Sequence, residues 1–309
     1  MIDESARGYL SIFAAIFLFS TVEVAAKLVH HLYGPSELDH WQLAFLRFLF
    51  AGIFLAVVLA ARGQLRTVLE ALRRDTLPLL FLGVLGIYLT FTLYYWGLER
   101  TRASTAAVVF CVNPVFTAVL ARPLLKESFR WRAWLGVALG LTGAALAILG
   151  SGSGGLPARS EVGGGAAVLA SALSWSLYTI VGKKYSERYG ETPVSFGGII
   201  IGAALFLATI LLRGDAGGFL YLHPNTWLIC LYIGVFTVGV AYLFYFGGLR
   251  RVPASSGASL FFLKPSLAVL LAWLVLGESP GPLWLPVILS SAGIFLTTWR
   301  SVSQEWVED

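Results

Sequence analysis

The stretch "SLFFLKPSLAVLLAWLVLGE", Ser259–Glu278, decides the class of fold. It overlaps a run of 23 residues, Ala254–Leu276, in which Lys264 is the only charged residue. Such length and apolarity predict a helix that spans a membrane. A lysine at the centre of a spanning helix costs about 2.5–3.5 kcal/mol on insertion scales. At ~16 Å from the helix start, its ammonium does not easily reach the interface. The folded protein must therefore compensate the charge of Lys264.

The whole chain has the composition of a membrane protein. Hydrophobic residues make up 57% of its 309 residues and charged residues 13%, and the mean hydropathy is +0.78, far from the soluble balance. Windows of about 19 residues predict ten spans with short connections. We therefore expect an all-α polytopic membrane protein with ten transmembrane helices. The predicted spans are Gly8–His31, Leu38–Ala61, Thr76–Leu98, Ala103–Leu125, Trp131–Gly150, Gly164–Tyr185, Pro193–Arg213, Asn225–Leu249, Ala254–Leu276 and Pro282–Arg300.

The placement of the basic residues predicts the orientation. With the N-terminus in the cytoplasm, fifteen Lys and Arg residues fall in cytoplasmic segments and four in outer segments. Cytoplasmic segments of membrane proteins carry the excess of positive charge, so both termini are expected in the cytoplasm, in an inner or plasma membrane. The net charge of +5 reflects this topology. No loop carries a basic patch interleaved with aromatic residues, so no nucleic-acid partner is expected.

The second half of the sequence repeats the first. The segment Phe19–Gly34, "FSTVEVAAKLVHHLYG", aligns with Trp175–Gly190, "WSLYTIVGKKYSERYG". Further along, an offset of 151 residues pairs identical residues. These pairs are Gly83 and Gly234, Tyr94 and Tyr245, Leu98 and Leu249, Pro114 and Pro265, and Glu127 and Glu278. We expect two five-helix repeats, residues 1–155 and residues 156–309. Because five is odd, the repeats must be inverted, as is common in secondary transporters, which bind substrate near midplane.

Several motifs accompany this doubled unit: "FST" and "WSL" in the aligned segments, "FLRFLFAG" at Phe45–Gly52, and "KES" and "GES" at Lys126–Ser128 and Gly277–Ser279. With them the chain resembles the drug/metabolite transporter superfamily, in its ten-helix EamA branch. The resemblance implies an exporter of amino acids or other small metabolites. It also implies a central cavity formed by helices 1–4 and 6–9, with helices 5 and 10 peripheral. Arg47 resembles a recurrent arginine of the family, and we expect a structural or gating role for it near the outer mouth.

Two polar residues occupy equivalent places before the repeated prolines. Lys264 precedes Pro265, and Asn113 precedes Pro114. Each proline removes a backbone donor and frees the carbonyl four residues before it. Freed backbone at membrane depth is tolerated where it is buried in protein or lines a wet cavity. We therefore expect Lys264 and Asn113 to contact substrate; the alternative is that the prolines only shape packing and that Lys264 forms a structural ion pair.

Glu23 is the one acidic residue deep within a predicted span. A buried carboxylate close to an ammonium is partly compensated. One hypothesis is that Glu23 and Lys264 face one cavity and bind the two ends of a zwitterion. The alternative is a permanent Glu23–Lys264 salt bridge, and Lys27, one turn after Glu23, is a third candidate partner.

Aromatic residues supply the apolar part of the expected site. The candidates are Tyr94, Trp175, Tyr178 and Tyr245, which repeat symmetry places on cavity helices; simple packing is the alternative for each. Cys111 and Cys230 fall within spans as small packing residues. Neither a metal nor a cofactor is expected, because no metal-ligand spacing occurs.

The leading function is therefore a secondary transporter that exports small amphipathic metabolites, amino acids first. A carrier for phosphorylated or lipid-linked sugars is the nearest rival, but it should have several clustered cavity cations. A receptor or an intramembrane enzyme is the alternative from another class, although no nucleophile–base pair is evident in the spans. The expected partners are a small-molecule substrate, the lipid bilayer and, as a candidate coupling ion, the proton, with the chain a monomer or weak homodimer.

Overall fold

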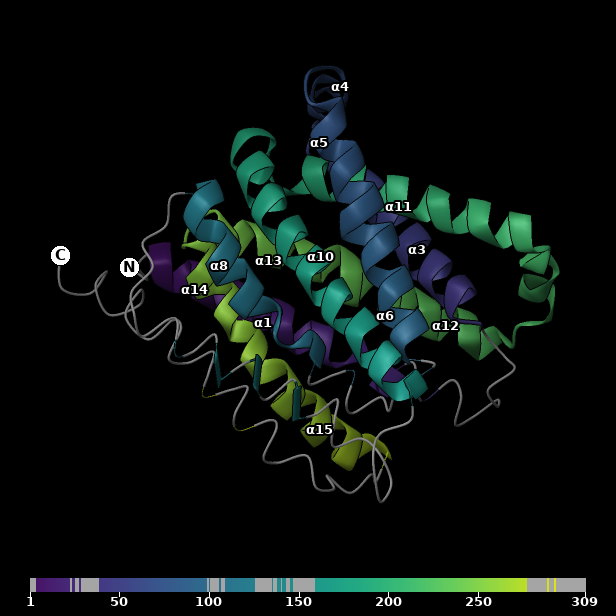
Figure 1. Cartoon of the computed structure of the whole chain (residues 1–309). Helices are drawn as coiled ribbons and strands as arrows, with labels where there is room; N and C mark the ends of the chain where they lie inside the picture. The colour runs from purple at the N-terminus through teal and green to yellow at the C-terminus, as the bar shows by residue number, and fades with distance from the viewer. Residues whose placement is uncertain are drawn as a thin grey trace.

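The structure, a computed structural model, describes residues 4–22, 24–25, 28, 39–98, 100, 106, 109–125, 135, 138–139, 141–142, 145–146, 159–276, 288 and 292. All regular elements among these residues are helices (Figure 1). Five of them are long and apolar enough to cross a membrane. They are His40–Ala61, Thr76–Leu98, Val162–Tyr189, Glu191–Arg213 and Pro224–Leu249. These five match predicted spans to within a few residues, and Thr76–Leu98 matches at both ends.

The stretch Gly150–Ser160 is the expected linker between the two repeats. The elements before the linker are α1 (Glu4–Ser20), α3 (His40–Ala61), α4 (Leu65–Arg74), α5 (Thr76–Phe81), the π-helix η1 (Leu82–Leu89), α6 (Thr90–Leu98) and α8 (Asn113–Leu125). Those after it are α10 (Arg159–Tyr189), α11 (Glu191–Arg213), the 3₁₀-helix η2 (Asp215–Tyr221), α12 (Pro224–Tyr232), the π-helix η3 (Ile233–Val240), α13 (Ala241–Leu249), α14 (Ala254–Ser259), the 3₁₀-helix η4 (Leu260–Phe262) and α15 (Leu263–Leu276). The predicted spans Trp131–Gly150 and Pro282–Arg300 lie almost wholly outside the described residues.

The two π-helices occupy equivalent places in the two repeats. Both η1 and η3 interrupt a long α-helix, and they are related by the same offset of 151 residues as the sequence repeat. A π-helical turn is rare and often occurs at functional sites. In η1 the carbonyl of Leu85 accepts from the hydroxyl of Thr90 at 2.9 Å and from that of Ser174, on α10, at 2.7 Å. The repeat seen in the sequence therefore has a counterpart in local backbone geometry.

Helices from the two halves of the chain interleave. Helix α3 packs against α11 and η3, α1 packs against α13 and α15, and α6 packs against α10. Figure 1 shows these long helices side by side, with α4 and α5 projecting at the top of the view. Each of these pairs joins a residue range before the linker to one after it, so the apolar core is shared by both halves.

Glycine allows the closest approach between two of these helices. The ring of Tyr178 on α10 lies so close to Gly86 of η1 that a Cβ atom at position 86 would overlap it. A different glycine property acts at Gly190, whose φ of 88° lies in the left-handed region. It lets the chain reverse between α10 and α11.

Candidate functional site

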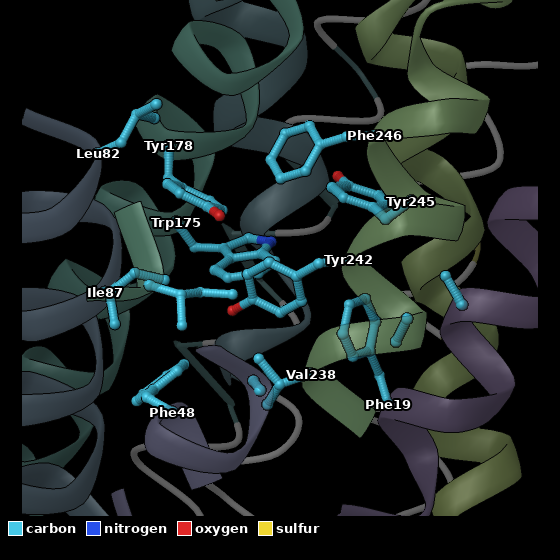
Figure 2. Packing of buried hydrophobic residues seen from close by; sticks show 14 of the residues in the cluster. Phe19, Phe48, Leu82, Ile87, Trp175, Tyr178, Val238, Tyr242, Tyr245 and Phe246 are labelled. Atoms are coloured by element: carbon cyan, nitrogen blue, oxygen red, sulfur yellow. The ribbon is translucent and has the colours of Figure 1, made fainter. Parts of the chain in front are cut away.

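A cluster of aromatic side chains fills the centre of the described bundle. Trp175 lies at its middle, with Tyr242 at 5.7 Å and Tyr178 at 5.1 Å between ring centroids (Figure 2). The rings come from α1, α6, α10, α13 and η4, so both halves contribute. The members used below, which we call the central cluster, are Phe19, Phe91, Tyr94, Tyr95, Phe110, Trp175, Tyr178, Tyr242, Tyr245 and Phe261.

The ring contacts of the cluster follow the sequence repeat. Tyr94 meets Phe110 edge-on at 5.3 Å, and their equivalents Tyr245 and Phe261 meet edge-on at 5.5 Å. Such edge-to-face pairs are the favoured aromatic geometry. Two equivalent pairs with matching geometry indicate that the halves build this part of the protein in the same way.

The predicted aromatic residues all belong to this cluster. Trp175, Tyr178 and Tyr245 are buried and Tyr94 is half-buried. The hydroxyl of Tyr245 is 3.3 Å from that of Thr179. Contact of these rings with substrate stays a prediction, and in this structure they pack on one another.

The chain is irregular before both repeated prolines, as expected. Residues 111–112 form a turn, and α8 begins directly after it at Asn113. The amide Nδ2 of Asn113 donates to the carbonyl of Phe110 at 2.9 Å. This is the carbonyl that Pro114 leaves without its helical donor. Asn113 thus satisfies the backbone group that the next residue frees.

Helix 9 of the prediction, Ala254–Leu276, is described as α14, η4 and α15, with the 3₁₀ turn just before Pro265. Lys264 is half-buried at the start of α15, and its Nζ lies 5.6 Å from the centroid of the Phe110 ring. Lys264 and Asn113, equivalent in the repeat, therefore both contact Phe110. Glu23 lies outside the described residues, so its pairing with Lys264 stays a prediction.

Arg47 is a buried cation at the edge of the central cluster. It is 5% exposed, and it lies ~10 Å along α3 from the helix start. Its guanidinium carbon is 4.9 Å from the ring centroid of Phe48 and 4.5 Å from that of Phe91, and its Nη1 donates to the hydroxyl of Tyr95 at 3.2 Å. Sequence reasoning predicted a structural or gating role, which stays a prediction.

Ion pairs join the two halves at one end of the bundle. Glu191, the first residue of α11, accepts from Arg62 at 3.4 Å and from Arg250 at 2.6 Å. Asp75 accepts from Arg188 at 2.8 Å and from the hydroxyl of Tyr189 at 2.5 Å. These contacts bring together the end of α3, the beginning of α11 and the end of α13.

At the same end, Lys183 caps a helix. Its Nζ donates to the carbonyl of Leu249, the last residue of α13, at 2.8 Å. It also donates to the carbonyl of Val252, just beyond the helix, at 2.7 Å. A cation at a helix C-terminus also interacts favourably with the helix dipole. Lys183 therefore fixes α10 to the end of α13.

Phe19, Tyr242 and Phe261 were not among the predicted site residues. The repeat alignment could have identified Phe19, because it aligns with the predicted residue Trp175, whereas Phe261 aligns with Phe110, which was not predicted either. Tyr242 aligns with Phe91. Cys111 and Cys230 are both buried, which agrees with a packing role.

The helices of membrane-spanning length and the repeated architecture define a multi-pass membrane protein with a doubled helical unit. Residues 6–149 and 163–299 each match the EamA-like transporter family. The chain belongs to this family, within the drug/metabolite transporter superfamily, and it is a transporter by family.

Individual relatives agree. The chain is 31% identical to an uncharacterized transporter of Clostridium kluyveri over 88% of this chain and 86% of the relative. It is 26% identical to a probable terminal-alkyne amino-acid exporter of Streptantibioticus cattleyicolor over 85% of each. A crystal structure superposes with a TM-score of 0.72 at 23% identity, over 96% of this chain and 98% of the other, which supports the fold.

Proposed function

We propose that the protein is a secondary transporter that exports small amphipathic metabolites, with amino acids as the leading class. The supporting observation is the central cluster, in which repeat-equivalent rings from both halves meet beside Arg47 and Lys264. Aromatic rings with a few polar groups among them are typical of sites for amphipathic small molecules. The similarity to a probable amino-acid exporter favours amino acids within this class.

The proposed mechanism is alternating access. The two repeats, residues 1–155 and residues 156–309, are inverted and rock against each other around the central cluster. The ion pairs of Glu191 with Arg62 and of Asp75 with Arg188 each join the two repeats, and they hold one end closed. Opening that end requires these contacts to break, and a substrate that enters between the aromatic rings replaces their mutual packing.

We also propose that ten helices lie in the inner membrane with both termini in the cytoplasm. The distribution of basic residues supports this orientation. A cysteine introduced by Ser153→Cys in the linker should react with a membrane-impermeant thiol reagent added outside the cell. Protection from outside, with labelling only from the cytoplasmic side, contradicts the topology.

Transport is tested with the purified chain in liposomes. Labelled amino acids of apolar, polar and charged side chain, and a sugar phosphate, are measured with and without a pH gradient. We expect at least one amino acid to cross several-fold faster than in empty liposomes, and the sugar phosphate to cross no faster. Movement of the sugar phosphate alone favours the carrier for phosphorylated sugars, and no movement of any amino acid contradicts the proposal.

A further inference from the structure

Arg47 has donors that the protein does not use. In the part of the chain that the structure describes, its Nε is buried without a hydrogen-bond partner, and its Nη1 donates to the neutral hydroxyl of Tyr95. Among the residues that the structure describes, no Asp or Glu forms an ion pair with it. A buried cation without an anion is costly unless a binding partner supplies one. Arg47 is therefore a candidate to bind an anion that a ligand supplies.

The guanidinium is held in place before any anion arrives. The rings of Phe48 and Phe91 lie 4.9 Å and 4.5 Å from its central carbon, and Tyr95 holds Nη1. Nε–H and the neighbouring Nη2–H form one edge of the guanidinium, and the Nε–H of this edge has no hydrogen-bond partner among the residues that the structure describes. A carboxylate binds such an edge through two parallel hydrogen bonds, and a fork that is already oriented loses little entropy on binding.

Two further buried donors belong to Trp175, whose ring contacts Phe91, and to Tyr242, whose ring contacts Trp175. Trp175 is 6.3 Å from Phe91 and 5.7 Å from Tyr242 between ring centroids. Among the described residues, neither the Nε1 of Trp175 nor the hydroxyl of Tyr242 has a hydrogen-bond partner, and both are buried. The hydroxyl of Tyr242 points to the side where Phe48 lies (Figure 2), and Phe48 is one of the two rings beside Arg47.

Arginine and tryptophan side chains can only donate hydrogen bonds, and a tyrosine hydroxyl donates as well. A group of unused donors of this kind matches an anion and does not match an ammonium. We infer that Arg47 binds the carboxylate of the transported molecule, with the Tyr242 hydroxyl as a second donor. This inference rests on the proposed function and names the substrate group that this part of the site recognises.

The assignment differs from the hypothesis that Lys264 binds the carboxylate. Lys264 lies against the face of Phe110 and has further interactions within the protein. Arg47 retains an unused N–H beside two aromatic rings. The observations therefore favour Arg47 for the anion, and Lys264 acts elsewhere in the site.

The first test compares acids with their amides in liposomes. Labelled leucine and phenylalanine and the two corresponding amides are measured for the full chain and for Arg47→Lys, Arg47→Gln and Tyr242→Phe. Arg47→Lys keeps the charge and removes the planar fork. We expect it to reduce transport of the acids at least tenfold and of the amides less than twofold. Tyr242→Phe should reduce transport of the acids several-fold. The control is Tyr232→Phe, which removes an exposed hydroxyl bonded to Thr21.

The second test does not depend on transport. Thermal unfolding of the protein in detergent is followed with leucine, leucinamide or inorganic phosphate at constant ionic strength. We expect leucine to raise the unfolding temperature of the wild type and not that of Arg47→Gln. If Arg47→Gln does not fold, Tyr242→Phe, which keeps the ring, carries the comparison. Stabilisation by phosphate and not by leucine overturns the carboxylate assignment.

The two proposals fail in different ways. A wild type that transports acids and amides, with the same acid-to-amide ratio in a folded Arg47→Lys, overturns the role of Arg47 and leaves the transporter intact. Binding of leucine that depends on Arg47, without transport of any amino acid, supports the anion site and contradicts the proposed function. Absence of both stabilisation and transport in the wild type contradicts both.

Discussion

The ring of Phe19 meets the ring of Trp175 edge-on, with 6.2 Å between centroids and an interplanar angle of 89°. These two residues are equivalent in the sequence repeat. Equivalent residues of two copies touch one another only where the copies meet about a common axis. The contact therefore identifies the place where the halves meet, and the residues around it are the ones that a motion of one half against the other must disturb.

Lys264→Met should leave the protein folded and lower transport of acids and amides alike by at least tenfold. The methionine keeps a similar length and removes a charge that costs about 2.5–3.5 kcal/mol to place at midplane. Lys264→Arg, which keeps the charge but changes the head group, should be intermediate. Transport in liposomes and gel filtration in detergent measure the two effects.

Normal transport by Lys264→Met would contradict a role in substrate handling. A variant that does not fold, and is rescued by Glu23→Gln, would instead identify a structural salt bridge between the two residues. An equal loss for acids and amides distinguishes Lys264 from Arg47, for which the loss is confined to acids.

Gly86→Ala should destabilise the protein by ~1–3 kcal/mol, the usual cost of overpacking a core. The added Cβ overlaps the ring of Tyr178, which is fully buried in the central cluster. Thermal unfolding in detergent measures the effect. The control is Gly163→Ala in α10, where the added Cβ meets no heavy atom within 4 Å. Equal unfolding temperatures for the two variants would refute the close packing of Tyr178 on η1.

Lys183→Met should lower the free energy of unfolding by ~1–3 kcal/mol. The substitution removes the ammonium that donates to the carbonyls of Leu249 and Val252. Both carbonyls then lack this hydrogen bond, which makes the folded state less stable. Lys184→Met is a matched control, because Lys184 is the next residue, is exposed, and has its Nζ 5.8 Å from the centroid of the Tyr185 ring. If both substitutions lower the free energy of unfolding equally, the hydrogen bonds of Lys183 at the end of α13 do not contribute to stability.

Glu191→Gln should change unfolding by less than ~1 kcal/mol, since its arginine partners are half-exposed. Its effect should appear in the balance between closed and open forms. If the closed form is destabilised by ~1 kcal/mol relative to the open form, the population of the open form rises about fivefold. Labelling of a cysteine at the buried position Ser186 should become faster by that factor.

The control for this experiment is Glu187→Gln. Glu187 pairs with Lys183 on its own helix and does not join the halves. Equal labelling rates in Glu191→Gln and the wild type would show that the pair of Glu191 with Arg62 does not hold this end closed.

Hydropathy predicted the long helices well, because a span of sufficient length leaves a continuous apolar run. Thr76–Leu98 was predicted to the residue, yet the π-helix within it was not. The wider hydrogen-bond spacing of a π-helix does not change the hydropathy of the sequence, so a hydropathy window cannot predict it. The irregularity before Pro114 and Pro265 was predictable, because proline removes a specific backbone donor.

The candidate site was predictable where the repeat constrains it. Tyr94, Tyr245 and Trp175 could be placed together by symmetry, and they are together. Arg47 could not be understood in this way, since its equivalent position carries no charge and its neighbours Phe91 and Tyr95 come from another helix. That a guanidinium donor would remain unused depends on tertiary packing, which no local pattern encodes.

The interleaving of the halves bears on how the chain assembles during synthesis. The faces of α1 and α3 that pack against α13 and α11 have no partner until those later helices have been made. Helices α1 and α3 must therefore wait in the lipid with these packing surfaces uncovered while the ribosome completes the later helices. The rate of translation through the Gly150–Ser160 linker thus affects folding. The packing of α1 and α3 is complete only after the later helices have been inserted.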